Sequence, residues 1–404
     1  MSTLIPKIIF WSCVCAVVYN YAGYPVVLFA LSMFAQAKSD LRFLFGSRAR
    51  RRGRSESDLP TVAILLSAYN EEAVIRAKVK NCLDLDYPHD RIEFLIGLDA
   101  PQDSTAEVLA QMHCSRVLVR HFPARQGKLA VLCALAQQTK ADIVISTDAN
   151  TMLKADCVRT LIRHFCDHRV GAVSGEEIRI TTRGTDAAGE SIYWRYESAL
   201  KFLESRLNCS LGGNGSVLAV RRPLFRLEKP SIVEDFQIPL DIRFKGYRVV
   251  YDPEAVAVEE IAPTVSAQFA RRIRLGAGDF QALFGNLACL NPRNGLPAFC
   301  FFSHRVLRWL GPVFLLIAFL ASLLLVEQPM FRFLVSAQCG FYVGAYLGYL
   351  RKKRGKAAGI LGLPVNFCSM NLALLLGLFQ YLSGRHSTIW KATPRTAITK
   401  PVEL

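Results

Sequence analysis

The sequence has few charged residues for its length: 20% of its 404 residues are charged. A wholly disordered chain is excluded, because disorder goes with low hydrophobicity and a high density of charge. The chain also lacks any Cys-x-x-Cys pair, although it contains 12 cysteines. A disulfide framework and a zinc site are therefore both disfavoured, and the scattered cysteines indicate a reducing compartment.

Hydrophobic residues, by contrast, make up 51% of the chain, and the mean hydropathy is +0.24. This composition is better explained by a soluble block joined to membrane helices than by a single soluble domain. Crossing roughly 30 Å of hydrocarbon takes about 20 helical residues. Four apolar stretches are long enough, or nearly so, and they cover residues 8–34, 306–326, 331–350 and 358–382.

The first apolar stretch has features of a retained anchor. A signal peptide has a basic start, a shorter apolar run and a cleavage site of small residues. This stretch has only Lys7 before it, and basic residues follow it. We therefore expect an N-terminal transmembrane anchor over residues 1–35.

Clusters of basic residues predict the orientation. Five arginines lie in residues 47–54, and five basic residues lie in residues 351–356. By the positive-inside rule both clusters are cytoplasmic, as is everything between the first two apolar stretches, whereas residues 327–329 belong outside. Much of the net charge of +16 is then due to topology. Nucleic-acid binding is not expected, because no base-stacking motif accompanies the charge.

The C-terminal tail conflicts with this orientation. Three spans after a cytoplasmic block place the tail outside, although it carries Arg385, Lys391, Arg395 and Lys400. Two explanations stay open: one apolar stretch does not cross, or the tail lies at an interface.

Between the first two apolar stretches, short aliphatic runs alternate with helical periodicity. Strands are predicted at residues 61–67, 93–98, 116–119 and 142–147, and helices at residues 71–83, 104–112 and 128–138. This alternation is typical of an α/β fold, with a parallel sheet and helices on its faces. Ligands of such sheets bind beyond the carboxyl ends of the strands.

Polar and acidic residues follow every predicted strand. The stretch after the first strand is Ala68, Tyr69, Asn70 and Glu71. Asp99 and Asp103 follow the second strand, Arg125, Gly127 and Lys128 follow the third, and Asp148 and Asn150 follow the fourth. A single one, such as Asp103 or Asn70, is explained equally well as a helix cap. Their coincidence at one sheet edge predicts a binding site.

The Asp148-x-Asn150 pair suits a divalent cation that carries a diphosphate. Mg²⁺ takes only one or two protein carboxylates together with phosphate oxygens, so a sparse pair of oxygen ligands is sufficient. The pattern alone is weak evidence, because it occurs by chance in many chains. Arg125 and Lys128 would supply positive charge for the same phosphates; the alternative for Lys128, a solvated helix start, is disfavoured for a cation.

Taken together, the motifs resemble the family 2 glycosyltransferases. They are Tyr69-Asn70-Glu71-Glu72, Asp99 with Asp103-Ser104-Thr105, Arg125-Gln126-Gly127-Lys128, Thr147-Asp148-Ala149-Asn150-Thr151, Val170-Gly171-Ala172-Val173-Ser174-Gly175, Gly213-Asn214-Gly215-Ser216, Val233-Glu234-Asp235 and Gly246-Tyr247-Arg248-Val249-Val250-Tyr251-Asp252-Pro253-Glu254-Ala255. The resemblance covers about residues 60–286 and implies the GT-A fold, a mixed sheet with helices on both faces. The order of anchor, catalytic block and C-terminal helices is similar to the membrane-embedded branch that contains hyaluronan, chitin and cellulose synthases.

The domains expected from this resemblance follow the apolar stretches. They are residues 1–35 as anchor, 36–58 as basic cytoplasmic linker, 59–260 as GT-A catalytic domain, 261–305 as amphipathic interface helices, 306–382 as C-terminal transmembrane helices and 383–404 as tail. The interface helices mix arginines with aromatic and aliphatic residues, which is typical of helices that lie on a membrane surface.

The resemblance also implies roles for the matched residues. A nucleotide-diphospho-sugar donor, expected to be a UDP-sugar, would be bound by Ala68, Tyr69, Asn70, Glu71, Asp99, Lys128, Asp148 and Arg274. Asp148 and Asn150 would hold Mg²⁺ or Mn²⁺, with one negative charge fewer than the more frequent Asp-x-Asp. The acceptor would be contacted by Gly213, Asn214, Gly215 and Trp194.

Glu234 and Asp235 match the Glu-Asp pair whose aspartate is the general base of the family. The implied reaction is an inverting transfer, in which Asp235 takes the acceptor's proton as its oxygen attacks the anomeric carbon; positioned base catalysis contributes about 10²–10⁴-fold. Without the other motifs, an ordinary acidic pair at a helix N-terminus would be an alternative explanation.

One departure bears on processivity. Processive members carry Gln-x-x-Arg-Trp, whereas this chain retains Arg274 but has Arg271 and Leu275 at the Gln and Trp positions. The missing tryptophan weakens the case for a stacking platform under a growing polymer. Trp194 is a candidate replacement, although packing of its indole against a core or a membrane interface explains it at least as well.

The leading hypothesis is a membrane-bound inverting glycosyltransferase that acts on a glycan or lipid-linked acceptor. It would be a multi-pass protein of the bacterial inner membrane, with a cytoplasmic catalytic domain and with partner proteins of a polysaccharide export assembly. Alternatives are a processive polysaccharide synthase, a nucleotidyltransferase, a transporter and a non-catalytic membrane scaffold. The nucleotidyltransferase would need a glycine-rich basic loop after the first strand, and intact Asp99, Asp148 and Asp235 oppose the last two.

Overall fold

The chain divides into two compact units. The computed structural model describes residues 3–45, 59–180, 187–226, 231–260 and 265–385. The sheet unit comprises Phe34–Thr182, Glu204–Pro263 and Ser387–Leu404, and the helical unit comprises Met1–Met33, Arg183–Leu203 and Thr264–His386. The basic cluster predicted at residues 47–54 and the tail after Arg385 lie outside the described residues.

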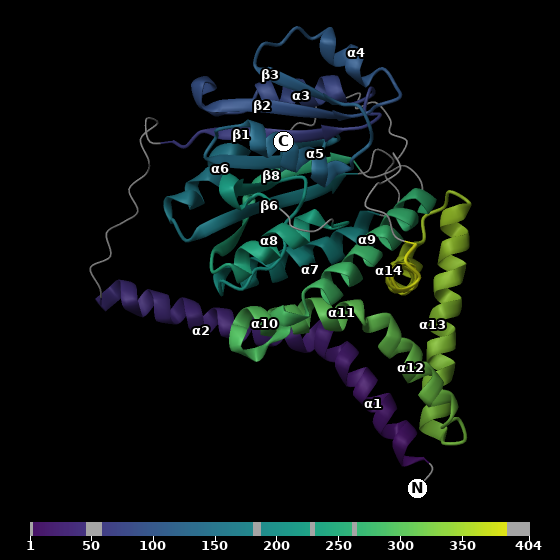
Figure 1. Ribbon diagram of the computed structural model, residues 1–404. Coiled ribbons are helices and arrows are strands. Elements are labelled where there is room, and N and C mark those ends of the chain that lie inside the picture. The colour runs from purple at the N-terminus through teal and green to yellow at the C-terminus, as the bar shows by residue number, and fades with distance from the viewer. Residues whose placement is uncertain (1–2, 46–58, 181–186, 227–230, 261–264, 386–404) are drawn as a thin grey trace. The chain divides into compact units, whose positions relative to one another are not determined.

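The sheet unit is built on one 8-stranded mixed sheet in the order β3-β2-β1-β4-β7-β6-β8-β5 (Figure 1). Its strands are β1 (Val62–Ala68), β2 (Ile92–Asp99), β3 (Val117–Phe122), β4 (Ile143–Thr147), β5 (Thr151–Leu153), β6 (Val170–Ile180), β7 (Leu218–Arg221) and β8 (Arg248–Glu260). The first four strands along the chain pair in parallel, as their alternation with helices predicts. Strand β7 runs antiparallel to β4 and β6, and β5 runs antiparallel to β8, so the other half of the sheet is mixed.

Helices cover both faces of this sheet. They are α3 (Ile75–Leu83), α4 (Thr105–Ala110), α5 (Lys128–Gln138), α6 (Cys157–Ile162) and α8 (Glu234–Phe244), with short 3₁₀ segments η3 (His89–Arg91), η4 (Arg163–Cys166) and η5 (Arg222–Leu224). Successive side chains of a strand point to opposite faces. In β1, Ile64 accordingly packs with Val158 of α6, whereas Leu65 packs with Leu132 of α5. Burial on both sides explains why the central strands are continuous apolar runs.

The helical unit contains the long apolar segments. Its elements are α1 (Leu4–Val18), the start of α2 (Tyr24–Phe45), α7 (Ala187–Arg206) up to Leu203, α9 (Val265–Gly285), α10 (Leu296–Cys300), α11 (Leu307–Trp309), α12 (Gly311–Leu323), α13 (Pro329–Lys353) and α14 (Gly362–Leu382). Two π-helical segments, η1 (Tyr19–Gly23) and η8 (Phe301–Val306), and three 3₁₀ segments, η6 (Leu287–Leu290), η7 (Pro292–Asn294) and η9 (Gly359–Leu361), complete it. Helix α9 falls within the predicted interface region and packs closely on α14: a methyl group on Gly377 would lie 2.7 Å from the backbone nitrogen of Ala277.

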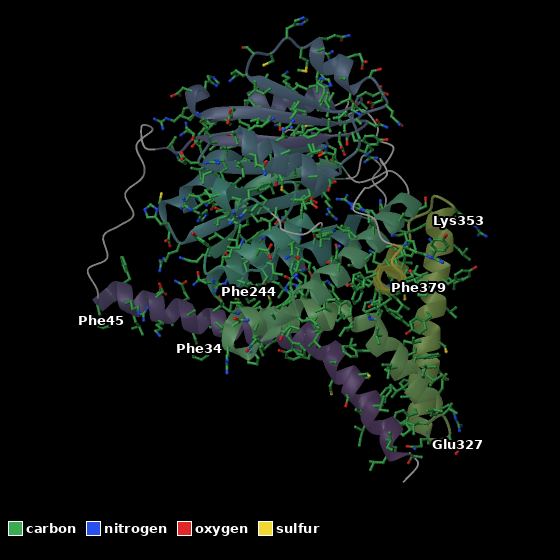
Figure 2. All side chains as sticks on the ribbon, in the orientation of Figure 1. Phe34, Phe45, Phe244, Glu327, Lys353 and Phe379 are labelled. Carbon is green, nitrogen blue, oxygen red and sulfur yellow. The ribbon has the colours of Figure 1, made fainter. Side chains whose placement is uncertain are left out.

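Three helical segments of the described chain are long and apolar enough to cross a membrane: Leu4–Phe45, Pro329–Lys353 and Gly359–Leu382. The span predicted at residues 306–326 falls in a bent pair of helices, Leu296–Trp309 and Gly311–Leu323, which meet at 56° and make a fourth candidate if the pair crosses as one span. Pro312 lies in the first turn after the bend and has no backbone N–H to continue the preceding helix. Figure 2 labels Glu327, which precedes α13, beyond one end of this helix and Lys353 at its other end. The predicted basic cluster at residues 351–356 thus begins in the last turn of α13.

Candidate functional site

The loop after β1 is tied to the loop after β2. Asn70 has a left-handed backbone (φ 55°), which asparagine adopts more readily than most residues, and its Oδ1 accepts a hydrogen bond from Gln102 N at 2.8 Å. The backbone nitrogen of Glu71 donates to Thr105 Oγ1 at 2.8 Å. Because this turn occupies the residues before Ile75, helix α3 begins later than the predicted residue 71. The turn presents the side chains that follow β1 at the carboxyl edge of the sheet.

Asp99 anchors the loop that leads into α5. Its side chain is 1% exposed, and its two oxygens accept from Gln126 N at 2.7 Å and Gly127 N at 3.0 Å. Gly127 needs its freedom from a side chain, because its φ is +90°. The guanidinium of Arg125 lies 3.4 Å from the ring centroid of Tyr69, so the loops after β1 and β3 also meet. The predicted contact of Asp99 with a uridine stays a prediction.

Lys128 joins the end of β4 to the start of α8. Its Nζ lies 2.7 Å from Asp148 Oδ1 and 2.7 Å from Glu234 Oε1, and the three side chains are 20%, 26% and 16% exposed. Burial lowers the pKa of Lys128, but the two carboxylates raise it by more, so the pKa stands above its ordinary value. Residues that are 20 and 106 positions from Lys128 in the sequence thus form one ionic cluster, which we call the Lys128 cluster.

The candidate base Asp235 lies next to this cluster. It occupies the first turn of α8, where unpaired backbone N–H groups favour a carboxylate. Gly213 N donates to the Asp235 carbonyl at 2.8 Å, and a methyl group on Gly215 would lie 3.1 Å from Asp235 Cβ and 3.5 Å from Lys128 Nζ. Asn214 Nδ2 donates to the Gly175 carbonyl at 2.6 Å. The predicted acceptor loop therefore packs directly against the predicted base.

A buried lysine that the sequence reasoning missed supports the loop at residues 148–150. Lys78 is fully buried, and its Nζ donates to Thr147 Oγ1 at 2.9 Å and to the Thr151 carbonyl at 2.5 Å. Burial lowers the pKa of this ammonium. The available signal was a lysine on the same helix face as Ile75, Val79 and Cys82, all of which are buried. Lys78 thus holds both ends of the Asp148-x-Asn150 loop from inside the sheet unit.

The donor atoms of this loop fit a hard divalent cation. Asn150 is 8% exposed, and its Nδ2 donates to Glu259 Oε1 at 3.1 Å, so its Oδ1 is the end directed away from Glu259. The Asp148 carboxylate and the Asn150 amide oxygen are ligands of the kind that Mg²⁺ and Mn²⁺ accept beside phosphate oxygens. No cluster of three His, Cys, Asp or Glu that could hold a metal occurs among the described residues. A cation here would rely on its diphosphate for the remaining ligands.

Two predicted site residues belong to the helical unit. Trp194 lies on α7, where its ring packs edge-on against Tyr193 at 5.5 Å between centroids. Arg274 lies on α9 and is partly buried. Their predicted roles toward acceptor and donor stay predictions.

Comparison with known proteins agrees with the predicted family. Residues 63–225 match the sequence profile described as Glycosyl transferase family 2. The beta-monoglucosyldiacylglycerol synthase of Synechocystis sp. is 27% identical over 268 residues, which cover 63% of this chain and 55% of the relative. The poly-beta-1,6-N-acetyl-D-glucosamine synthase of Staphylococcus aureus is 24% identical over 237 residues, 56% of each protein. The chain thus spans about half the length of the curated relatives it matches.

A solved structure shares the fold. A mannosyltransferase from Pyrobaculum calidifontis, solved with GDP-Man and Mn²⁺, aligns with a TM-score of 0.69 at 20% identity and covers 93% of this chain and 100% of that chain. The predicted fold class, a GT-A mixed sheet with helices on both faces together with apolar helices, is therefore confirmed.

Proposed function

Because residues 63–225 match the profile of the family 2 glycosyltransferases, we propose that this chain is a membrane-bound inverting glycosyltransferase that moves a sugar from a nucleotide-diphospho-sugar to a lipid or glycan acceptor. The observation that carries the proposal is the Lys128 cluster. In it the Lys128 ammonium links Asp148, the carboxylate proposed to face the diphosphate, to Glu234, the residue before the proposed base Asp235. Donor and acceptor chemistry would thus be served within one small region of the sheet unit.

Asp235 is proposed as the general base. Its carboxylate would accept the proton of the acceptor hydroxyl as that oxygen forms a bond to the anomeric carbon. The bond from this carbon to the diphosphate oxygen breaks in the same step, and the nucleoside diphosphate leaves from the opposite face with inversion. The hydrogen bond from Gly213 N to the Asp235 carbonyl holds the first turn of α8 in place for this proton transfer.

Lys128 and the Asp148-x-Asn150 loop are proposed to stabilise the departing diphosphate. Asp148 and Asn150 would hold Mg²⁺ or Mn²⁺, which as a Lewis acid offsets the charge that develops on the leaving oxygen. The ammonium of Lys128 would turn from its carboxylate partners toward the phosphates and donate hydrogen bonds to them. Lys78 would keep the backbone of the loop in place during this exchange.

The acceptor is proposed to be at the membrane. The named activities of the two relatives are synthesis of a glycolipid and of a polysaccharide, and three described helices of this chain are apolar enough to span a bilayer. The replacement of the Gln and Trp of Gln-x-x-Arg-Trp by Arg271 and Leu275 favours transfer of a single sugar. A cytoplasmic catalytic domain follows from the positive-inside rule.

The test is a donor panel with the full chain in membranes or detergent. UDP-sugars and GDP-sugars would be offered one at a time with Mn²⁺, and released nucleoside diphosphate would be measured together with the length of the labelled product. We expect release from one donor class, a lipid-extractable product carrying one sugar, and loss of release with EDTA that added Mn²⁺ restores. A folded protein that turns over none of the donors would contradict the proposed activity, and a ladder of long products would replace single transfer with processive synthesis.

A further inference from the structure

A second polar cluster contacts the Asp148-x-Asn150 loop through the side chain of Asn150. It comprises Asn150, Glu177, Arg179, Ser216 and Glu259, which come from the β4–β5 loop, from β6, from the segment before β7 and from β8. We call it the Glu259 cluster. The side chains of Glu259 and Glu177 are only 5% and 11% exposed, so their charges depend on partners within the protein.

The pairing of the strands brings these residues together. Glu259 of β8 lies opposite Thr151 of β5, the residue after Asn150, and opposite Arg179 of β6 on the other side. Neighbouring strands are about 4.8 Å apart, which is within reach of long side chains. The register of β5 on β8 therefore determines that the side chain of residue 150 meets a buried glutamate.

Three hydrogen bonds and one ion pair connect the side chains of the cluster. Ser216 Oγ donates to Glu177 Oε2 at 2.6 Å, and Arg179 Nε donates to Glu177 Oε1 at 2.6 Å while lying 3.7 Å from Glu259 Oε2. Asn150 Nδ2 donates to Glu259 Oε1 at 3.1 Å. Two carboxylates thus share one guanidinium, and the neutral amide of Asn150 supplies a further donor without adding negative charge.

This arrangement explains the asparagine at residue 150. Glu259 Oε1 accepts a hydrogen bond from the amide of residue 150, so the NH₂ group faces Glu259 and Oδ1 faces away from it. An aspartate would instead place a third carboxylate about 3.1 Å from Glu259, with Arg179 as the shared cation. An aspartate carboxylate also has no N–H to donate to Glu259 Oε1, so the hydrogen bond that orients residue 150 would be lost.

We propose that Glu259 is a positioning residue of the donor site, which orients the Asn150 amide so that Oδ1 faces the metal and diphosphate, and that Glu259 is the reason this chain carries Asn rather than Asp at residue 150. The inference rests on the proposed function, because it assumes that the Asp148-x-Asn150 loop binds a metal–nucleotide complex. Partners of this kind, one step removed from the metal, change metal affinity by about 10–100-fold when they are removed.

The test is a set of variants measured by two methods: free Mn²⁺ by electron paramagnetic resonance during titration in the presence of UDP and, separately, of GDP, and the thermal unfolding midpoint without metal. E259M, which has no acceptor for Asn150, should weaken Mn²⁺–nucleotide binding by about 10–100-fold. E259Q keeps an amide oxygen as acceptor and should stay within a few-fold of wild type.

The reciprocal change tests the choice of asparagine. N150D should bind about 10-fold more weakly and unfold at a lower temperature, because it adds a carboxylate to the cluster. N150D/E259Q should recover both properties, because the amide introduced at residue 259 can donate a hydrogen bond to the carboxylate introduced at residue 150.

Glu254 provides the matched control. It lies on the same strand, its side chain is 70% exposed, and its partner is Arg163 rather than Asn150. E254Q should therefore bind Mn²⁺ and nucleotide as the wild type does. A folded E259M that binds as tightly as wild type would overturn the proposal, as would effects of N150D and E259Q that simply add. Failure of the wild type itself to bind Mn²⁺ with either nucleotide would instead count against the proposed function.

Discussion

The two units each contain an ionic cluster, and the clusters differ in how far their side chains are exposed to solvent. The Lys128 cluster of the sheet unit has side chains 16–26% exposed, and it lies at the carboxyl ends of the strands. The helical unit holds Glu197 of α7 between Arg308 of α11 and His304 of η8, and these side chains are 6%, 7% and 1% exposed. One cluster is open to an incoming ligand, whereas the other is sealed.

In the sealed cluster, Arg308 has several polar partners besides Glu197. Arg308 donates to Asn20 Oδ1 at 3.3 Å and to the hydroxyls of Tyr193 and Tyr196, each at 3.4 Å, in addition to Glu197. Asn20 Nδ2 donates to the Ser303 carbonyl at 2.8 Å, within the π-helical segment η8. Enclosed charges of this kind hold helices together, whereas the charges around Lys128, whose side chain is 20% exposed, can change partners when a ligand binds. We therefore expect changes in the sealed cluster to alter stability and changes in the open cluster to alter turnover.

The largest effect should come from the open side. Asp235→Asn removes the carboxylate that would accept the acceptor's proton, and turnover should fall by about 10²–10⁴-fold. Affinity for the nucleoside diphosphate, measured by calorimetry, should stay close to wild type. The control is Asp241→Asn on the same helix, which keeps an oxygen to accept from Gln237 Nε2. Wild-type turnover by folded Asp235→Asn protein would remove Asp235 as the base.

Breaking the sealed cluster should cost stability. Arg308→Met leaves the buried Glu197 carboxylate without its main cation and should lower the free energy of unfolding by about 3–5 kcal/mol. The measurement is the midpoint of thermal unfolding of the detergent-solubilised chain. Glu197→Met combined with Arg308→Met should cost less than Arg308→Met alone, because the double variant also removes the buried carboxylate, which Arg308→Met leaves with only His304 at 3.3 Å and Arg305 at 3.9 Å. If Arg308→Met unfolded at the same temperature as wild type, the expected contribution of this cluster to stability would be contradicted.

Removing the central cation of the open cluster should reduce turnover strongly and stability only slightly. Lys128→Met leaves Asp148 and Glu234 within reach of water, so we expect the free energy of unfolding to change by no more than about 1 kcal/mol. Turnover should nevertheless fall by about 10²-fold, because a donor to the developing diphosphate charge is lost. Lys128→Arg, which keeps the charge, should recover part of the turnover. A large loss of stability with normal turnover would contradict the assignment of the Lys128 cluster to catalysis rather than to stability.

The smallest effect should come from an exposed ion pair, which sets the baseline for the other changes. Arg163 and Glu254 lie 2.6 Å apart, with side chains 49% and 70% exposed. Glu254→Gln should change the free energy of unfolding by about 0.5 kcal/mol or less, because water screens such pairs. Unfolding in urea, compared with wild type, checks this value, and a shift as large as that of Arg308→Met would mean that exposure does not separate these clusters.

Much of the sheet unit was predictable. The apolar runs that became β1 and β4 are buried on both faces, as continuous apolar strands of a parallel sheet are expected to be. Helix α5 has the predicted bounds, since Gly127 ends the preceding loop and Lys128 begins the periodic segment. The polar residues after each strand likewise predicted a site at the carboxyl edge of the sheet, where Lys128, Asp148 and Glu234 meet. These features depend on local pattern and on one general rule about parallel sheets.

Other features depend on contacts between distant segments. The span predicted at residues 306–326 is bent after Trp309, and the pairing of two π-helical segments near Asn20 and Ser303 left no mark in the sequence. Glu259 meets Asn150 only because β5 and β8 pair in one register, across 109 residues of chain. Lys78 was hidden for the same reason, because its two acceptors belong to β4 and β5.

By itself the sequence determined the alternation of strands and helices, the apolar segments and the chemical character of the sheet edge, because each follows from the order of residue types along short stretches. Only the tertiary structure decided which charges share a partner and which are sealed from water. That decision depends on strand register and helix packing, which bring together residues that no local pattern connects.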